Sequence, residues 1–164
     1  MKRALSLILA LVMCLGLCAC GSATIKNNET VTAGSYSFAV TKTEFVDQYY
    51  NGNFYEYVAD GDVHFVVETK FNNVGKTETR IPHGFMTLEY GDGYTFQPTD
   101  QYHYSFSTGG FVNNADELPL MGQDKPCIVY FDVPAAVEQN TSEPLKLVIK
   151  IAGQEFEYIV REGK

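Results

Sequence analysis

The chain has 164 residues, with 12 lysines and arginines against 20 aspartates and glutamates, so its formal net charge at pH 7 is −8. A chain this acidic is repelled by phosphate backbones and by anionic lipid headgroups, which excludes a nucleic-acid-binding protein. Hydrophobic residues make up 45% of the chain, which includes 11 tyrosines, 11 phenylalanines and no tryptophan, a composition sufficient for one buried core.

The first predicted element is an N-terminal export signal. Lys2 and Arg3 precede a short apolar run over residues 4–18. This run is shorter than the roughly 20 apolar residues that a membrane span needs. A basic start followed by a short apolar segment is typical of a secretory signal peptide, which should end in small residues. Here the run ends in Leu17-Cys18-Ala19-Cys20.

This ending resembles the lipobox of bacterial lipoproteins, in which an aliphatic residue and two small residues precede a cysteine. The resemblance implies that residues 1–19 are a signal peptide, that cleavage follows Ala19, and that diacylglycerol is attached to the thiol of Cys20. No other cofactor is expected. Two acyl chains would anchor the protein stably at the outer face of the cell membrane. The alternative is an ordinary signal peptide, or an uncleaved anchor, with incidental cysteines.

The remaining cysteines indicate how the fold is stabilised. Cys14 and Cys18 would leave with the signal peptide and Cys20 would carry lipid, so Cys127 would be the one remaining thiol. A single thiol can form neither an intramolecular disulfide nor a cysteine-based zinc site. The fold is therefore expected to depend on its hydrophobic core.

Residues 20–33 contain little apolar mass and no periodicity, which predicts a lipidated flexible tether before a single domain over residues 34–164. Within that domain, short runs alternate apolar and polar side chains with period two, as strands with one buried face do. The apolar positions of three such runs are Tyr36, Phe38 and Val40; Val63, Phe65, Val67 and Phe71; and Cys127, Val129, Phe131 and Val133. No helical period is sustained, and at most a turn of helix is expected, at 43–50 or 134–139.

Two hairpins are predicted. Gly91-Asp92-Gly93 separates an apolar run ending at Tyr90 from one beginning at Tyr94. A turn at Ala152-Gly153 would give the pairs Ile149–Phe156, Leu147–Tyr158, Leu145–Val160 and Lys150–Glu155. Apolar residues would then face apolar residues, and lysine would face glutamate. Many short strands separated by turns predict an all-β, immunoglobulin-like β-sandwich.

Four segments carry a family resemblance: Val40-Thr41, Asn73 with Gly75-Lys76, Asp92-Gly93-Tyr94, and Phe131-Asp132-Val133-Pro134. In this order they resemble the immunoglobulin-like domain of unknown function that recurs in lipoproteins of Gram-positive bacteria, a fold relative of a secreted mycobacterial immunogenic antigen. One departure is the segment 121–125, which lacks the proline usual before the Phe-x-Val-Pro strand. The resemblance covers residues 34–162 and implies an envelope-facing sandwich without established chemistry.

The sequence contains none of the motifs that are typical of catalytic or metal-binding sites. His64, His83 and His103 are not spaced as in H-E-x-x-H, and no serine lies in a G-x-S-x-G turn. Cys127 shares a strand face with apolar residues, so it is expected to be a core residue and not a nucleophile. The Asp60-Gly61-Asp62 loop offers carboxylates but lacks the calcium-binding pattern. We therefore expect neither an enzyme nor a metal site.

Aromatic residues cluster outside the strands that are predicted by regular alternation, over residues 49–58 and 102–111. The candidate binding surface consists of Tyr49, Tyr50, Phe54, Tyr55, Tyr57, Tyr102 and Tyr104. Tyrosine on a loop is a large, stiff and amphipathic contact residue, although strand positions in both clusters would also suit packing in the core.

The sequence thus predicts a lipid-anchored extracytoplasmic protein whose domain is a non-catalytic interaction module for an envelope protein or a surface polymer. The alternative is a small-ligand or glycan-binding lipoprotein associated with transport. A tyrosine-lined pocket would favour the alternative, whereas a flat exposed apolar patch would favour the interaction module.

Overall fold

The computed structural model describes residues 22–50, 55–112 and 115–164. The predicted signal peptide, the lipidated Cys20 and Phe54 of the candidate surface lie outside the described residues.

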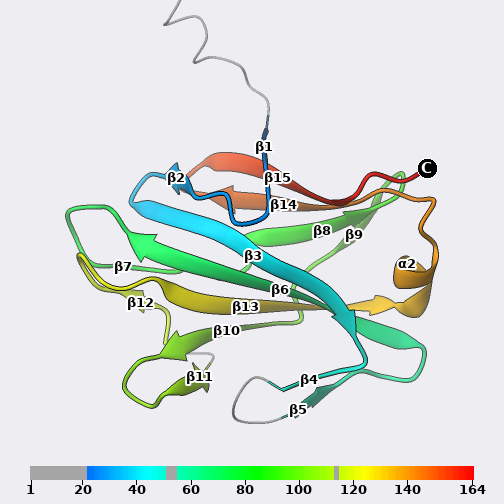
Figure 1. Cartoon of the computed structure of the whole chain (residues 1–164), viewed down its shortest axis with the longest axis horizontal. Helices are drawn as coiled ribbons and strands as arrows, with labels where there is room; N and C mark the ends of the chain where they lie inside the picture. The colour runs from blue at the N-terminus through cyan, green and yellow to red at the C-terminus, as the bar shows by residue number, and fades with distance from the viewer. Residues whose placement is uncertain (1–21, 51–54, 113–114) are drawn as a thin grey trace, which may run out of the picture.

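Two β-sheets pack face to face as a sandwich (Figure 1), which confirms the predicted all-β sandwich. The five-stranded sheet has the order β1 (Ala23–Ile25), β15 (Gln154–Arg161), β14 (Leu145–Ile151), β8 (Met86–Tyr90), β9 (Tyr94–Phe96). The six-stranded sheet has the order β11 (Gly110–Val112), β10 (Asp100–Ser105), β13 (Lys125–Pro134), β6 (Asp62–Asn73), β3 (Tyr36–Val46), β2 (Val31–Ala33).

Two short antiparallel pairs and one short helix complete the described part of the fold. The pairs are β7 (Thr79–Arg80) with β12 (Glu117–Leu118), and β4 (Gln48–Tyr50) with β5 (Tyr55–Tyr57). Helix α2 (Ala135–Gln139) lies within the range 134–139, where a turn of helix was expected. The other range considered, 43–50, forms strand instead.

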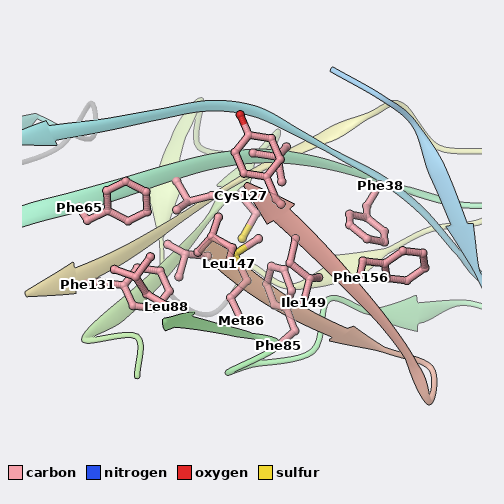
Figure 2. Close-up of a cluster of buried hydrophobic side chains, with 14 of the residues drawn as sticks. Phe38, Phe65, Phe85, Met86, Leu88, Cys127, Phe131, Leu147, Ile149 and Phe156 are labelled. Carbon is pink, nitrogen blue, oxygen red and sulfur yellow. The ribbon is translucent and has the colours of Figure 1, made fainter. Parts of the chain in front are cut away.

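The core lies between the two sheets (Figure 2) and is built from the period-two positions of the long strands. On β13, the side chains of Cys127, Val129, Phe131 and Val133 are all completely buried. They face Leu147 and Ile149 of the opposite sheet, which are also completely buried. The predicted buried positions of β3, β6 and β13 are confirmed, except that Tyr36 is half-buried and packs against the edge of the core.

Both predicted hairpins are present. In the C-terminal hairpin, Ile149 pairs with Phe156, Leu147 with Tyr158, and Lys150 with Glu155, as predicted. Leu145 pairs with Arg161 instead of Val160, because the register shifts between Leu145 and Lys146. A bulge of this kind adds one residue to one strand. The residues between the bulge and the turn keep their regular alternation, so the sequence pattern does not predict the bulge.

Residues 23–33 belong to the sandwich, so the prediction of a flexible tether over residues 20–33 is wrong for these positions. Strand β1 pairs in parallel with β15, and β2 pairs antiparallel with β3. Ile25 and Ala33 are buried, with 3% and 0% of their surfaces exposed. Each strand places just one residue fully in the core, so three residues give too little periodicity to be recognised in the sequence.

The turn between β14 and β15 holds a non-glycine residue in a left-handed conformation. Ala152 has φ +51° and Gly153 has φ +75°. This turn packs closely against the turn between β2 and β3, because a Cβ on Gly34 would lie 2.8 Å from the Cβ of Ala152. The two turns therefore join the ends of the two sheets, and Ala152 bears the steric cost of its φ.

Replacing Ala152 with glycine is expected to raise the free energy of unfolding by about 0.5–1 kcal/mol, because glycine adopts positive φ without steric penalty. Urea denaturation measures the difference. The matched control is Ala59→Gly at an exposed position whose φ is not positive. That change should lower stability by about 0.4–1 kcal/mol, because it gives the unfolded chain more freedom. A loss of stability in Ala152→Gly equal to that of the control would contradict the assignment of strain to Ala152.

Candidate functional site

The outer face of the six-stranded sheet carries a second apolar cluster. Val66 of β6 and Ile128 and Tyr130 of β13 alternate with core residues and therefore point away from the core. Their side chains are nevertheless buried, with 1–2% of their surfaces exposed, and they pack with Tyr102 of β10. Exposure of such an apolar face to water is unfavourable, so another segment of the chain is expected to pack against it.

The hairpin of β4 and β5 supplies part of this cover through Tyr49. The ring of Tyr49 lies 5.3 Å from the ring of Tyr130 in an edge-on contact. Its hydroxyl donates a hydrogen bond to the carboxylate of Glu68, at 3.3 Å. Burial, together with the Glu68 carboxylate, raises the pKa of the Tyr49 hydroxyl, so the group stays protonated and remains a donor. Tyr49 thus attaches the hairpin to the sheet by both packing and a hydrogen bond.

The other tyrosines of the hairpin face solvent. Tyr50 and Tyr55 are each 54% exposed, and Tyr57 is 70% exposed. The ring centroids of Tyr50 and Tyr55 are 4.8 Å apart, and those of Tyr55 and Tyr57 are 6.3 Å apart, with interplanar angles of 34° and 37°. We call Tyr50, Tyr55 and Tyr57 the tyrosine platform. It is a row of three neighbouring rings on an anchored hairpin.

The second predicted aromatic segment is buried only in part, and residues 106–109 are exposed. Tyr102 is 5% exposed and donates its hydroxyl hydrogen to Asp100 at 2.6 Å, so its prediction as a surface residue is wrong. Tyr104 is half-buried between the rings of Phe106 and Phe111, at 5.3 and 5.4 Å. The structure therefore gathers Tyr49 and the platform on one hairpin and places Tyr104 on another, formed by β10 and β11.

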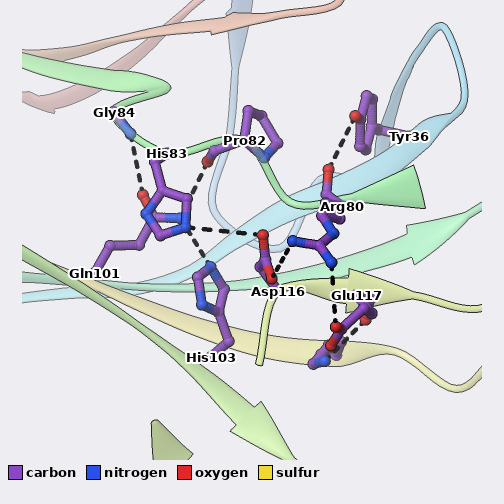
Figure 3. Close-up of polar contacts among 10 residues, drawn as sticks. Tyr36, Arg80, Pro82, His83, Gly84, Gln101, His103, Asp116 and Glu117 are labelled. Atoms are coloured by element: carbon purple, nitrogen blue, oxygen red, sulfur yellow. Dashed lines mark hydrogen bonds and ion pairs between the residues drawn. The ribbon is translucent and has the colours of Figure 1, made fainter. Parts of the chain in front are cut away.

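A polar cluster that the sequence did not reveal lies where the inner face of β10 meets the loop 81–85 (Figure 3). The side-chain oxygen of Gln101 accepts a hydrogen bond from the Gly84 N–H at 3.3 Å. Its Nε2 donates to the carbonyl of Pro82 at 3.0 Å and lies 2.8 Å from Nε2 of His103. Because the amide nitrogen can only donate, Nε2 of His103 accepts, and the ring proton is on Nδ1.

His103 is fully buried in this cluster. Its burial, reinforced by the neighbouring His83 at a ring distance of 5.4 Å, lowers its pKa to about 4. His83 in turn lies 3.8 Å from a carboxylate oxygen of Asp116. The three residues come from separate segments of the chain, so inspecting each histidine alone could not associate them. The detectable signal was the run of polar residues at alternate positions of β10, namely Gln101, His103 and Ser105.

The lowered pKa predicts a loss of stability in acid. The ordinary pKa of histidine is 6.5, whereas that of His103 in the folded protein is about 4. Between these pH values the unfolded chain binds more protons than the folded one, so the free energy of unfolding falls as the pH decreases. In His103→Asn this fall should be smaller. Urea denaturation at several pH values across this window measures it, and an unchanged pH dependence in the variant would contradict the assignment.

The thiol of Cys127 is completely buried in the core, as predicted. Burial raises its pKa to about 12, which keeps the thiol protonated and therefore a poor nucleophile. Among the described residues, no three His, Cys, Asp or Glu side chains come together as a metal-ligand set. Within the same ranges, no helix is both long and apolar enough to cross a membrane.

A hollow of about 390 Å³ lies beside the hairpin of β8 and β9, and sequence reasoning did not indicate it. Its lining residues are Tyr90, Gly91, Asp92, Tyr94, Asn140 and Glu143. The hairpin itself was predicted, but the approach of residues 140–143 depends on tertiary structure.

No protein-family model matches the chain, and no curated protein sequence matches it. An uncharacterized β-sandwich protein from Clostridium difficile 630 matches in structure with a TM-score of 0.73 at 17% identity, over 86% of this chain and 95% of that chain. The yjhA protein from Bacillus subtilis has a TM-score of 0.49 at 14% identity, over 82% and 97% of the two chains. A proposed lipoprotein, ycdA, from Bacillus subtilis subsp. subtilis str. 168 has a TM-score of 0.45 at 12% identity, over 81% of this chain and 38% of that chain.

At such low identity, the likeness to the Clostridium difficile protein shows a shared β-sandwich alone. The chain is therefore similar in fold to a β-sandwich protein of unknown function. The finer resemblance to an immunoglobulin-like lipoprotein domain stays a prediction.

Proposed function

We propose that this chain is a lipid-anchored extracytoplasmic protein whose β-sandwich is a non-catalytic interaction module at the cell envelope. The observation that supports this most is the tyrosine platform, whose three rings are each more than half exposed. Exposed neighbouring aromatic rings contribute little to folding, whereas they provide large, rigid contact area at low entropic cost. Tyr49 holds the hairpin in place, so the platform is organised before any partner binds.

The position of β1 supports an anchored arrangement. Only Gly21 and Ser22 separate Cys20 from the start of β1. A lipid on Cys20 would therefore keep β1 within about 10 Å of the membrane, given the maximum length of an extended chain. The hairpin of β4 and β5 lies at the opposite end of the molecule from β1 (Figure 1). In this arrangement the hairpin that carries the tyrosine platform lies away from the membrane, where a partner can reach it.

A small-ligand or glycan-binding role is the second candidate. The hollow lined by Tyr90 and Tyr94 favours it, because two aromatic rings lie there with the carboxylates of Asp92 and Glu143.

Replacing Cys20 with alanine tests the anchor. The unchanged protein should begin at residue 20, carry the mass of a diacylglyceryl group and enter the detergent phase on partitioning. The Cys20→Ala variant should lack this mass and stay in the aqueous phase. The control is Cys18→Ala, which keeps a small residue in the lipobox and should behave like the unchanged protein. If the unchanged protein is soluble and unlipidated, the anchored function is wrong.

The interaction itself is tested by capture from the cell surface. The full chain should retain an envelope partner, and a variant carrying Tyr50→Ser, Tyr55→Ser and Tyr57→Ser should lose it. Val74→Ser is the control, because Val74 is 53% exposed, like Tyr50 and Tyr55, and follows the end of β6 that is remote from the hairpin. If the triple variant and the control retain equal amounts of the envelope partner, the tyrosine platform is not the contact surface.

A further inference from the structure

The segment that carries the tyrosine platform is strongly acidic. Between Lys42 and Lys70 the sequence contains no lysine or arginine. Over the same stretch it contains six acidic residues, which are Glu44, Asp47, Glu56, Asp60, Asp62 and Glu68. The platform therefore lies in a negative field that extends over about 10 Å at moderate ionic strength.

The two flanking cations do not offset this charge at the platform. The ammonium group of Lys42 is paired with the carboxylate of Glu44 and lies 3.8 Å from that of Glu68. The ammonium group of Lys70 lies 3.4 Å from Asp124. Both lysines are thus engaged by carboxylates on the body of the sandwich.

Three of these six carboxylates lie next to the ends of the hairpin in the chain. Asp47 joins β3 to β4, Asp60 lies in the connection from β5 to β6, and Asp62 is the first residue of β6. Asp47 and Asp60 are exposed and Asp62 is half-buried. Among the ion pairs of the described residues, none involves these three carboxylates. Their charge is therefore available to a partner.

The face of an aromatic ring also attracts positive charge. Lysine and especially arginine stack on tyrosine rings through the ring quadrupole. Tyr55 and Tyr57 lie two residues apart on one strand, with ring centroids 6.3 Å apart. Alternate residues of an extended peptide repeat at about 6.4–6.8 Å, so two alternate side chains of such a peptide match this spacing.

We infer that the tyrosine platform binds an extended basic segment of a partner protein. Arginine or lysine residues at alternate positions stack on Tyr55 and Tyr57, and further positive charge faces Asp47, Asp60 and Asp62. This inference rests on the proposed function and specifies its partner. Anionic surface polymers and anionic lipid do not fit, because the same carboxylates repel them.

The test uses the full chain in detergent and a fluorescein-labelled peptide of eight residues with alternating arginine and serine. Fluorescence anisotropy measures its dissociation constant at low and high salt. Replacing Tyr55 and Tyr57 with serine should weaken binding about tenfold. Replacing Asp47, Asp60 and Asp62 with asparagine should weaken it by a similar factor and reduce its salt dependence. The control Val74→Ser should bind within about twofold of the unchanged chain, because Val74 is 53% exposed and follows the end of β6 that is remote from the hairpin.

Two further probes separate the alternative occupants. A peptide of alternating glutamate and serine stands for an acidic partner, and vesicles of phosphatidylglycerol stand for an anionic membrane. Either probe binding as tightly as the basic peptide would overturn the inference. An equal loss in Val74→Ser, or no binding of the basic peptide at about 1 mM, would also overturn it.

The inference and the proposed function can fail separately. If the triple-tyrosine variant loses its envelope partner but the basic peptide does not bind, the interaction module stands and its cationic partner is wrong. If the triple-tyrosine variant keeps its envelope partner, the platform is not the contact surface and both are wrong.

Discussion

Replacing Phe71 with alanine is expected to lower the free energy of unfolding by about 3–5 kcal/mol. Phe71 is completely buried. Its ring contacts those of Phe85, Phe38 and Tyr36, at centroid distances of 5.2, 5.7 and 6.4 Å. Truncation removes these contacts and leaves a cavity that a packed β-sandwich fills poorly. The loss is a large share of the roughly 5–15 kcal/mol that stabilises a typical domain.

Urea denaturation followed by circular dichroism measures this loss. The matched control is Phe106→Ala, because Phe106 is 55% exposed and should cost less than about 1 kcal/mol. If Phe71→Ala does not fold, Phe71→Leu gives a smaller loss of about 1–2 kcal/mol that can still be measured. Equal losses in Phe71→Ala and Phe106→Ala would contradict the central position of Phe71 in the core.

Replacing Asn73 with alanine should lower the free energy of unfolding by about 2–4 kcal/mol, because several backbone groups lose their partner at once. Asn73 is 5% exposed at the end of β6. Its Nδ2 donates to the carbonyls of Thr77 and Leu118, at 2.8 and 2.9 Å, and its Oδ1 accepts from the Gly75 N–H at 2.9 Å. The side chain thus links the end of β6 to its own turn and to β12.

The neighbouring Asn72→Ala is the control for this experiment, because Asn72 makes a single exposed hydrogen bond, to Asp124. It should cost less than about 1 kcal/mol. Asn73→Asp separates the contributions, since it keeps the acceptor for Gly75 and loses both donors. A loss in Asn73→Asp much smaller than in Asn73→Ala would contradict the importance of the two donated bonds.

The same contacts explain the Asn-x-Gly pattern on which part of the family resemblance rests. A Cβ on Gly75 would lie 2.6 Å from Oγ of Ser35 and 2.7 Å from its Cβ. The adjacent Val74 N–H donates to the carbonyl of Ser35 at 3.0 Å. Glycine is needed at position 75 because the turn between β2 and β3 packs directly against it.

Local patterning in the sequence predicted the long strands and their buried faces. Period-two alternation identified the core positions of β6 and β13, because a strand with one buried face must alternate. The turn at Ala152-Gly153 and the pair Lys150–Glu155 fixed the C-terminal register up to the bulge at Leu145. These features are local, so a single stretch of chain contains all the information that specifies them.

Tertiary structure alone decided which outward faces are covered. Tyr102 and Tyr57 look equivalent in the sequence, yet Tyr102 is 5% exposed and Tyr57 is 70% exposed. Alternation assigns a side chain to a face, but whether that face meets water depends on segments far away in the chain. The pairing of β1 with β15 and the assembly of His83, His103 and Asp116 depend on distant segments in the same way. Contacts of this kind form between distant segments when the two sheets pack together, so local periodicity does not predict them.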